Sequence, residues 1–453
     1  MPVMKKIACF LLFWGFVVSI SAQNYLLSKD GNALYSIVVD KQADSLTMFA
    51  AEELQDYLHK ISGARFKISN KSAVREKSIF IGKDWFAVRP QMAQLNALGE
   101  DGYCIFSESG HFYLGGNRPA GDLYAVYALL QDYTGCVWFG NGEVYVPNEP
   151  ALSLPGLRVF AKPDFSFRHP HFPDRNKPEY YFPTRTQPMD QWGMFVHTFQ
   201  HLMPPDKYFD AHPEYFSMVN GKRIRDGQLC LSNPEVIGLL KENLAAEMAR
   251  KPDHKYSSVS QNDCINYCEC EHCQALYKKY GSISGVYVDM ANQIARTFPG
   301  KQISTLAYQF TRSAPAHIVP DSNVNIMFCS IECNRSQPLA EDNRSKDFVK
   351  DMKDWAALTH NIFMWDYVVQ FKTYVCPFPN FGVLQPNIQF FRQHGVPMMF
   401  QQGSGSSWSD FSEYKQALIA RLLWDADVDE PAFRKKFFRS EERRVGKECR
   451  SRW

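Results

Sequence analysis

Apolar positions in the first third of the chain alternate between strand-like and helix-like spacing. The spacing predicts strands at 35–39 and 78–81, an amphipathic helix at 45–61, a hairpin of strands 103–105 and 112–114, and a helix at 123–133. Residues 23–150 are therefore predicted to form a small α+β domain. A glycine-rich run at 115–121 lacks the Lys-Ser/Thr pair of a phosphate loop, and we interpret it as a tight structural turn.

Short apolar runs alternate with helical patterns from residue 165 to 438, after a proline-rich linker at 151–164. Eight strands with interleaved helices are typical of a (β/α)8 TIM barrel, so the predicted fold class is α/β. The predicted helices are 234–250, 286–298, 345–358, 388–394 and 412–425. The predicted strands are 165–172, 194–199, 228–231, 256–260, 303–310, 324–330, 362–367 and 397–402.

The two ends of the chain differ from the rest. Lysines at 5–6, an apolar run at 7–20 and small residues at 21–22 follow the order of a secretory signal peptide, predicted at 1–22. The run of about 14 apolar residues is shorter than the roughly 18 that a membrane helix needs, so we expect a secreted or periplasmic protein with no membrane span. Residues 439–453 resemble a sequencing adapter read in frame, which predicts a non-native tail and a missing C-terminal portion.

The composition narrows the class of partner. A net charge of +2 over 453 residues argues against a nucleic-acid partner, which would need a basic face. Aromatic residues make up 14% of the chain, which suits the binding of sugar rings, although such residues more often belong to the core. A glycan is therefore the expected partner, and no cofactor is expected.

Three cysteines, Cys268, Cys270 and Cys273, form a compact run. An exported protein can hold disulfides, and such a run can also bind a structural metal. Zinc would need a distant fourth ligand such as Cys230, because no second Cys-x-x-Cys completes the set nearby. We expect a structural cluster of disulfides, free thiols or a metal site, and no catalytic metal.

Polar and aromatic residues follow the predicted strands at their carboxyl ends, where TIM barrels build active sites. Acidic, amide and aromatic groups on one rim fit glycoside hydrolysis, in which carboxyl groups act on the glycosidic bond and rings stack on sugars. Asp263 has a second interpretation, as the cap of the following helix. The rim residues are, in strand order, His169, His171, His197, His201, Asn262, Asp263, Tyr308, Gln309, Glu332, Trp365, Asp366, Tyr367, Gln401 and Gln402.

Several segments carry a family resemblance. They are His212-Pro-Glu-Tyr-Phe216, Gln228–Asn233, Val259–Asp263 with Tyr267–Cys273, Trp365-Asp-Tyr367 with Pro377-Phe-Pro379, and Leu422-Leu-Trp424. They resemble a Bacteroidetes-enriched family, long an uncharacterised domain, that includes glycoside hydrolase family 163, endo-β-N-acetylglucosaminidases acting on complex N-glycans. The N-terminal part resembles the α-glucuronidase N-terminal-type domain, and the resemblance covers about residues 30 to 438.

The resemblance implies two catalytic schemes. In the first, the substrate's acetamido oxygen is the nucleophile, Asn262 orients it, and Asp263 protonates the leaving group. In the second, Asp263 is the acid and Asp366 the nucleophile, about 5 Å apart for a retaining outcome. Glu332 is a third carboxyl for either scheme. Asp263 is expected in a closed, aromatic-walled pocket that keeps the acid protonated near neutrality. The expected substrate-binding residues are His169, His197, His201, Tyr308, Trp365, Tyr367 and Gln402.

Two other interpretations stay open. A non-catalytic carbohydrate-binding barrel would keep the aromatic residues without needing Asp263 to titrate. An α-glucuronidase-like hydrolase would need a basic clamp for the uronate, with Arg168, Arg312 and Arg335 as candidates. The eighth predicted strand ends in Gln401-Gln402-Gly403, where the family pattern leads us to expect an acidic residue.

Overall fold

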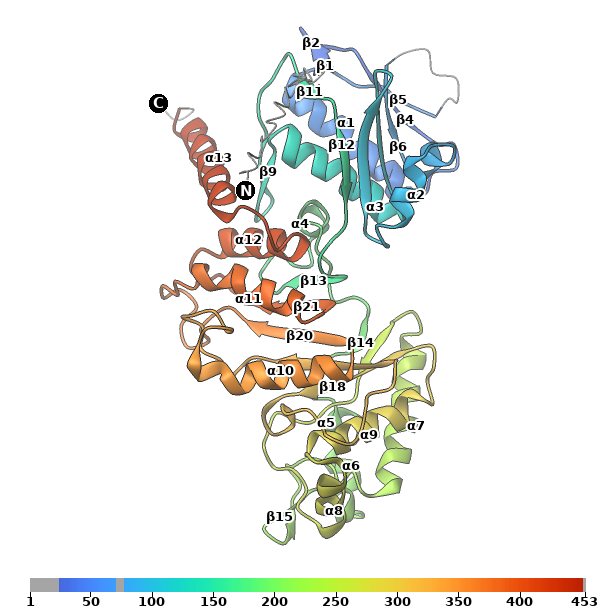
Figure 1. The fold of residues 1–453 in the computed structure, drawn as a ribbon, viewed down its shortest axis with the longest axis vertical. Helices are drawn as coiled ribbons and strands as arrows, with labels where there is room; N and C mark the ends of the chain where they lie inside the picture. The colour runs from blue at the N-terminus through green and yellow to red at the C-terminus, as the bar shows by residue number, and fades with distance from the viewer. Residues whose placement is uncertain (1–23, 71–76, 451–453) are drawn as a thin grey trace, which may run out of the picture.

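The computed structural model describes residues 24–70 and 77–450, so the expected signal peptide at 1–22 lies outside the described residues. The described chain forms two packed regions, each around its own sheet. The N-terminal sheet lies at one end of an elongated molecule, and α8 (Glu271–Tyr280) lies at the other (Figure 1). No helix in the described ranges combines the length and the apolar composition needed to cross a bilayer.

The N-terminal region is built on a six-stranded mixed sheet in the order β12-β7-β8-β6-β4-β5. β4 pairs in parallel with β5 and β6, and β6 with β8, whereas β7 is antiparallel to β8 and β12. Helices α1 (Ser45–Ser62) and α3 (Pro119–Ala128) pack together and share the main apolar core of this region. The strands are β4 (Ser36–Val39), β5 (Ile68–Ser69), β6 (Ser78–Ile81), β7 (Tyr103–Glu108), β8 (His111–Gly116) and β12 (Arg158–Ala161).

The amphipathic helix predicted at 45–61 is confirmed as α1. Asp44 caps its start, because the side chain accepts hydrogen bonds from the N–H groups of Leu46 and Thr47 at 2.8 and 2.9 Å. Gly63 ends the helix with φ at +73°, a conformation that glycine adopts without a Cβ clash.

The glycine-rich run at 115–121 is confirmed as a tight turn. Gly116 in β8 and Gly121 in α3 lie so close that a Cβ on Gly116 would sit 2.3 Å from the Gly121 Cα atom. The carboxylate of Asp122 accepts hydrogen bonds from Gly116 N–H at 2.7 Å and from the Thr47 hydroxyl at 2.8 Å. The glycines therefore allow β8 and α3 to approach closely.

Part of the predicted linker at 151–164 is paired into sheets. β12 adds an edge strand to the N-terminal sheet, and β11 (Ser153–Pro155) pairs with β1 (Asn24–Leu26). Prolines in this segment led us to predict a linker, but proline is tolerated on edge strands. The remaining short strands are β2 (Ser28–Lys29), β3 (Asn32–Ala33), β9 (Val137–Gly140) and β10 (Glu143–Tyr145).

The second region is built on a seven-stranded parallel sheet in the order β13-β21-β20-β19-β18-β17-β14. The first strand pairs with the last, as in a barrel, and Figure 1 shows α10, α11 and α12 stacked alongside. The strands are β13 (Phe167–Pro170), β14 (Trp192–Met194), β17 (Tyr256–Ser258), β18 (Gln302–Ala307), β19 (Val324–Cys329), β20 (Ile362–Tyr367) and β21 (Met398–Gln402).

The remaining helices are divided between the two regions. The first region also contains α2 (Gln91–Asn96). The helices that follow along the chain are α4 (Pro178–Thr184), α5 (Phe199–Leu202), α6 (Pro205–Tyr208), α7 (Pro234–Arg250), α8, α9 (Ser284–Ala295), α10 (Lys346–Leu358), α11 (Phe381–Gln393), α12 (Ser412–Trp424) and α13 (Glu430–Arg450).

The prediction of a strand at 228–231 is wrong. Only Leu229 makes an isolated bridge there, to Phe216, so the sheet of the described chain has seven strands instead of eight. The segment follows a small hairpin of β15 (Met218–Val219) and β16 (Lys222–Arg223), and its buried Leu229 and Leu231 pack in the large apolar cluster that includes side chains of α7.

Side chains alternate between two faces along β20, which decides what each can reach. Phe363, Trp365 and Tyr367 pack in the cluster inside the sheet. Ile362 and Met364 pack in the larger cluster shared with the surrounding helices. Because the strand period is two, Asp366 falls on the helix side.

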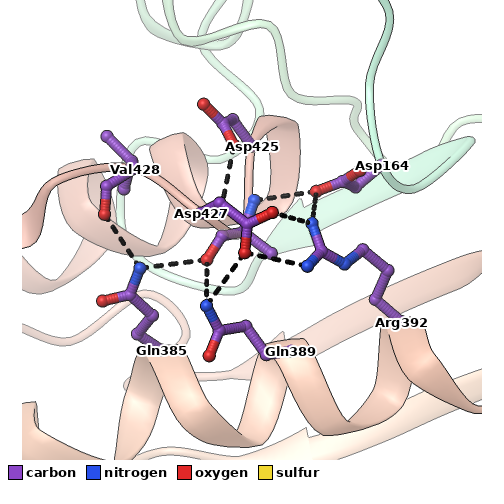
Figure 2. A network of polar contacts seen from close by, with 8 residues as sticks. Asp164, Gln385, Gln389, Arg392, Asp425, Asp427 and Val428 are labelled. Carbon is purple, nitrogen blue, oxygen red and sulfur yellow. Dashed lines mark hydrogen bonds and ion pairs between the residues drawn. The ribbon is translucent and has the colours of Figure 1, made fainter. Parts of the chain in front are cut away.

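A polar network links the chain just before β13 to α11 and to the segment after α12 (Figure 2). Arg392 on α11 donates to Asp164, just before β13, and to both carboxylate oxygens of Asp427, each at 2.8 Å. Gln385 and Gln389, on the same helix, donate to the backbone of the segment after α12. The network therefore holds the first strand, α11 and the end of α12 together.

Candidate active site at the carboxyl ends of the sheet

Asp263 and Tyr308 meet at the ends of two adjacent strands. Asp263 lies on the loop after β17, Tyr308 follows β18 directly, and the Tyr308 hydroxyl donates to Asp263 Oδ1 at 3.3 Å. Burial, together with the Asp263 charge, raises the pKa of Tyr308 to about 12, so its hydroxyl stays protonated at neutral pH. The N-cap of α8 is Cys270, so Asp263 does not cap that helix.

The closed pocket expected around Asp263 is not present. Asp263 lies on the loop between β17 and α8, and it is exposed. A substrate, and not the protein alone, would have to shield this carboxyl from water.

Asn262 ties the same loop to other segments. Its Nδ2 donates to the Gly227 carbonyl at 2.9 Å, and its Oδ1 accepts from Gln200 N–H at 3.0 Å. The Gln228 side chain accepts from Asn262 N–H at 2.9 Å and donates to the carbonyl groups of Asn262 and Cys264. Much of the hydrogen-bonding capacity of the Asn262 amide is therefore used inside the protein.

Glu332 lies after β19, on the same rim. It is exposed, and its carboxylate lies 3.7 Å from Arg312 Nη1, while Arg312 Nε donates to Asp351 at 2.7 Å. Burial raises the pKa of Tyr367, and the charges of Tyr308 and Glu332 contribute to the rise.

Asp366 is not on this rim. It is buried, accepts a hydrogen bond from the Ser330 hydroxyl at 2.6 Å, and lines a small cavity with Leu384 of α11. Burial raises the pKa of Asp366, although Ser330 and Arg335 act in the opposite direction. The strand alternation that points Trp365 inward points Asp366 toward the helices, so the predicted pairing of Asp366 with Asp263 has no geometric support.

Aromatic rings form a platform inside the sheet. Trp365 stacks on Phe195 with ring centroids 5.1 Å apart and planes 17° apart, and on Tyr367 at 6.1 Å and 26°. Phe400 packs against Trp365 at 4.6 Å. Phe195 was missed as a site residue, although its place in the run predicted at 194–199 was a usable signal. In the described part of the chain, the buried Trp365 Nε1 has no hydrogen-bond partner.

His169 on β13 and His171, just after that strand, form a neutral pair. The buried His169 lies with Nδ1 2.7 Å from the Gln187 carbonyl and Nε2 3.2 Å from His171 Nδ1. Burial lowers the pKa of His169 to about 3 and that of His171 to about 4. Neither ring carries a charge at neutral pH, so this pair offers hydrogen bonds and not ionic contacts.

The other predicted binding residues divide into two groups. His197 places Nδ1 2.9 Å from the Gln261 carbonyl, and its ring centroid lies 6.1 Å from that of Tyr308, which puts it in the site. Gln402 pairs with Tyr367 across adjacent strands. His201 instead lies on α5, 3.4 Å from Glu247 of α7, and the structure does not bring it to this group.

The three arginines considered as a uronate clamp all have partners inside the protein. Arg168 is buried and pairs with Asp101 at 2.8 Å. Arg312 donates to Asp351 and lies close to the carboxylate of Glu332. Arg335 donates to backbone carbonyls, including that of Tyr367 at 2.9 Å.

The predicted cysteine run is brought together with Cys230. Cys268, Cys270, Cys273 and Cys230 are all buried, free of disulfides, and close to one another.

The chain belongs to a family described as "Domain of unknown function (DUF4838)", which matches residues 138–441, more than half of the sequence. Residues 23–129 match the family described as "Glycosyl hydrolase family 67 N-terminus". No curated protein sequence matches the chain.

Solved structures of glycoside hydrolases share the fold. The chitobiase FjGH20 of Flavobacterium johnsoniae is similar with a TM-score of 0.53 and 13% identity, over 93% of this chain and 70% of that one. The GH20 beta-N-acetylhexosaminidase of Streptomyces coelicolor A3(2) gives 0.52 and 12%, over 92% and 91%. The family GH115 4-O-methyl-alpha-glucuronidase BtGH115A gives 0.49 and 11%, over 89% of this chain and 57% of that one.

The fold class predicted from the sequence is confirmed by the parallel sheet and by the two GH20 structures. The N-terminal family match and the barrel give the chain the architecture of glycoside hydrolases.

Proposed function

We propose that the protein is an exported glycoside hydrolase of the endo-β-N-acetylglucosaminidase type, acting on glycans that contain N-acetylglucosamine. The observation that carries the proposal is the Asp263–Tyr308 pair beside the stacked rings of Trp365 and Tyr367, at the carboxyl ends of a parallel sheet. The segments that resemble glycoside hydrolase family 163 support the substrate class. So do the chitobiase and the hexosaminidase that share the fold.

Asp263 acts as the general acid in this proposal. Its proton passes to the glycosidic oxygen as the bond from that oxygen to the anomeric carbon breaks. The substrate's acetamido oxygen attacks the same carbon and forms a cyclic intermediate. Water then opens this intermediate and returns a proton to Asp263. Tyr308 orients the carboxylate throughout, since its hydroxyl stays a donor.

Glu332, rather than Asn262, is the group that we assign to the acetamido side of the reaction. Glu332 is an exposed carboxylate on the loop after β19, 3.7 Å from Arg312 Nη1. The Asn262 amide is already bonded to Gly227 and Gln200, which makes it a positioning residue for the loop of Asp263. If a protein nucleophile acts instead, Glu332 replaces Asp366 in that role, because Asp366 faces the helices.

The α-glucuronidase alternative has one observation in its favour, the N-terminal family match at 23–129. The site does not add to it, because Arg168, Arg312 and Arg335 are all engaged inside the protein. A uronate carboxylate would have to displace one of these contacts.

The test compares the wild type with Asp263→Asn on three substrates: a released complex N-glycan, an aryl N-acetylglucosaminide and an aryl glucuronide. We expect hydrolysis of the first two. Asp263→Asn should slow the glycan reaction by about two to four decades, because its leaving group needs the proton. The aryl N-acetylglucosaminide, with its good leaving group, should be affected far less.

Asp226→Asn is the matched control, because Asp226 is an exposed aspartate on the adjacent loop. It should leave all rates unchanged. Full activity of Asp263→Asn on the glycan would contradict the assignment of the acid. Glycan binding without any hydrolysis would support a carbohydrate-binding barrel instead, and cleavage of the glucuronide alone would support the α-glucuronidase.

A further inference from the structure

Four buried thiols converge beside the loop of Asp263. The sulfur atoms of Cys230, Cys268, Cys270 and Cys273 all lie within 4.8 Å of one another. Cys230 Sγ is 3.7 Å from Cys270 Sγ and 3.9 Å from Cys273 Sγ. Tetrahedral zinc with Zn–S bonds of about 2.3 Å requires sulfur atoms about 3.8 Å apart, so these separations fit a four-thiolate site.

The surroundings of the sulfur atoms favour thiolates. Cys268 Sγ accepts from Met218 N–H at 3.4 Å and lies 3.7 Å from the Arg223 guanidinium. Cys270 occupies the N-cap position of α8 and Cys273 lies in the first turn of that helix, where free N–H groups and the helix dipole stabilise negative charge. N–H donors and a cation around thiolates are the outer contacts that zinc–sulfur sites use.

We propose that Cys230, Cys268, Cys270 and Cys273 bind one structural zinc ion. The sequence offered only three of these ligands as a run, and the fold supplies Cys230 from the segment before α7. All four positions are filled by protein thiolates, so no position is left for water or substrate, and the ion has a structural role.

The zinc ion would fix the loop that carries Asp263. Cys268 lies on the same loop as Asp263, while Cys230 follows Gln228, whose side chain bonds that loop at Asn262 and Cys264. One ion would therefore link the two segments, in addition to the hydrogen bonds that already join them. This role does not depend on which glycan the protein cleaves.

The test measures metal content and thiol chemistry of the full chain, purified without chelators or reductants. We expect about one zinc per chain by elemental analysis, and four cysteines that resist alkylation until a strong chelator or acid releases the metal. Replacing zinc by cobalt should give the visible absorption bands of tetrahedral thiolate ligation. Cys270→Ser should lower the zinc content at least tenfold, whereas Cys376→Ser, which removes an exposed cysteine outside the cluster, should not.

Three results would overturn the proposal. They are four cluster cysteines paired as disulfides, four reactive thiols with no metal, or iron at the same stoichiometry. If Cys270→Ser does not fold, the wild-type metal content and the cobalt spectrum still decide the question. Zinc without hydrolysis would leave this site intact and reject only the proposed function.

Discussion

The hydroxyl of Tyr308 donates a hydrogen bond to Oδ1 of Asp263 across 3.3 Å, between the ends of neighbouring strands β18 and β17. With a pKa of about 12, Tyr308 cannot serve as a base at neutral pH, and its role is that of a donor. The pair therefore orients Asp263 at the end of β17.

Tyr308→Phe is expected to lower kcat/KM on the glycan by about 10- to 100-fold, the range for losing a hydrogen bond to a charged group. Steady-state kinetics on the glycan provide the measurement. Tyr256→Phe makes the same chemical change at the start of β17 and should leave kcat/KM unchanged. An unchanged kcat/KM for Tyr308→Phe would mean that the contact does not operate during the reaction.

Asp366→Asn is expected to keep activity on both the glycan and the aryl substrate within about twofold of the wild type. Asp366 faces α11, and an asparagine oxygen can still accept the bond from Ser330. The measurement is steady-state kinetics on both substrates, next to Asp263→Asn. A loss of several decades on both would restore Asp366 as a nucleophile and would show that the strand rearranges when substrate binds.

Asn262→Ala and Gln228→Ala are expected to have similar effects, a fall in kcat of about tenfold on both substrates with an unchanged pH profile. Both side chains hold the loop of Asp263, and neither needs to touch the sugar. Kinetics of the two variants decide between positioning and direct binding. If Asn262→Ala is severely impaired while Gln228→Ala is normal, Asn262 orients the acetamido group itself.

The sequence allowed β20 to be predicted at its observed bounds, yet the direction of Asp366 was missed. The signal was present, because inward-facing Trp365 and Tyr367 force the residue between them to the other face. Sequence position alone suggested a rim residue. The strand period therefore decides which side chains of β20 face the cluster inside the sheet and which face the helices.

The segment 228–231 shows a limit of a different kind. Its apolar residues are buried, so the pattern resembled a strand, but Leu229 and Leu231 pack in the core cluster that includes α7, and Cys230 packs in the thiol cluster. The contacts that decide this are long-range: Gln228 to Asn262, and Cys230 to Cys270. Spacing along one sequence cannot reveal which distant segment meets another, and so the fourth cysteine ligand could be suggested but not assigned.

Asp122 is expected to make the stability of the N-terminal region depend on pH. Burial raises the pKa of Asp122 to about 7, although the bonds from Gly116 and Thr47 act in the opposite direction. The unfolded chain releases this proton near pH 3.9. The folded state therefore binds the proton more tightly, and this contribution to stability is complete below about pH 4 and is lost as the pH rises to 7, by up to about 4 kcal/mol.

Urea denaturation at several pH values between 4 and 7.5 checks the expectation for Asp122. Asp122→Asn should be less sensitive to pH over this range than the wild type, and Asp30→Asn, at an exposed turn, should follow the wild type. If Asp122→Asn keeps the full pH dependence, other groups cause it.

Arg392→Ala is expected to lower the free energy of unfolding by about 1 to 3 kcal/mol, the range for hydrogen bonds to charged groups. Arg392 bonds Asp164 and Asp427 at 2.8 Å, and the side chains of Arg392 and Asp164 are each only 28% exposed (Figure 2). Solvent therefore screens this contact less than it screens an ordinary surface pair.

Arg225 provides the matched control for Arg392, because it also bonds two aspartates. Its partners Asp206 and Asp210 are 92% and 85% exposed, so Arg225→Ala should cost less than about 1 kcal/mol. Denaturant titration of both variants gives the comparison. The Arg392 network joins the start of the first strand to α11 and the end of α12. Equal losses for the two variants would therefore mean that the apolar core holds these elements together, and that this network contributes no more than a surface ion pair.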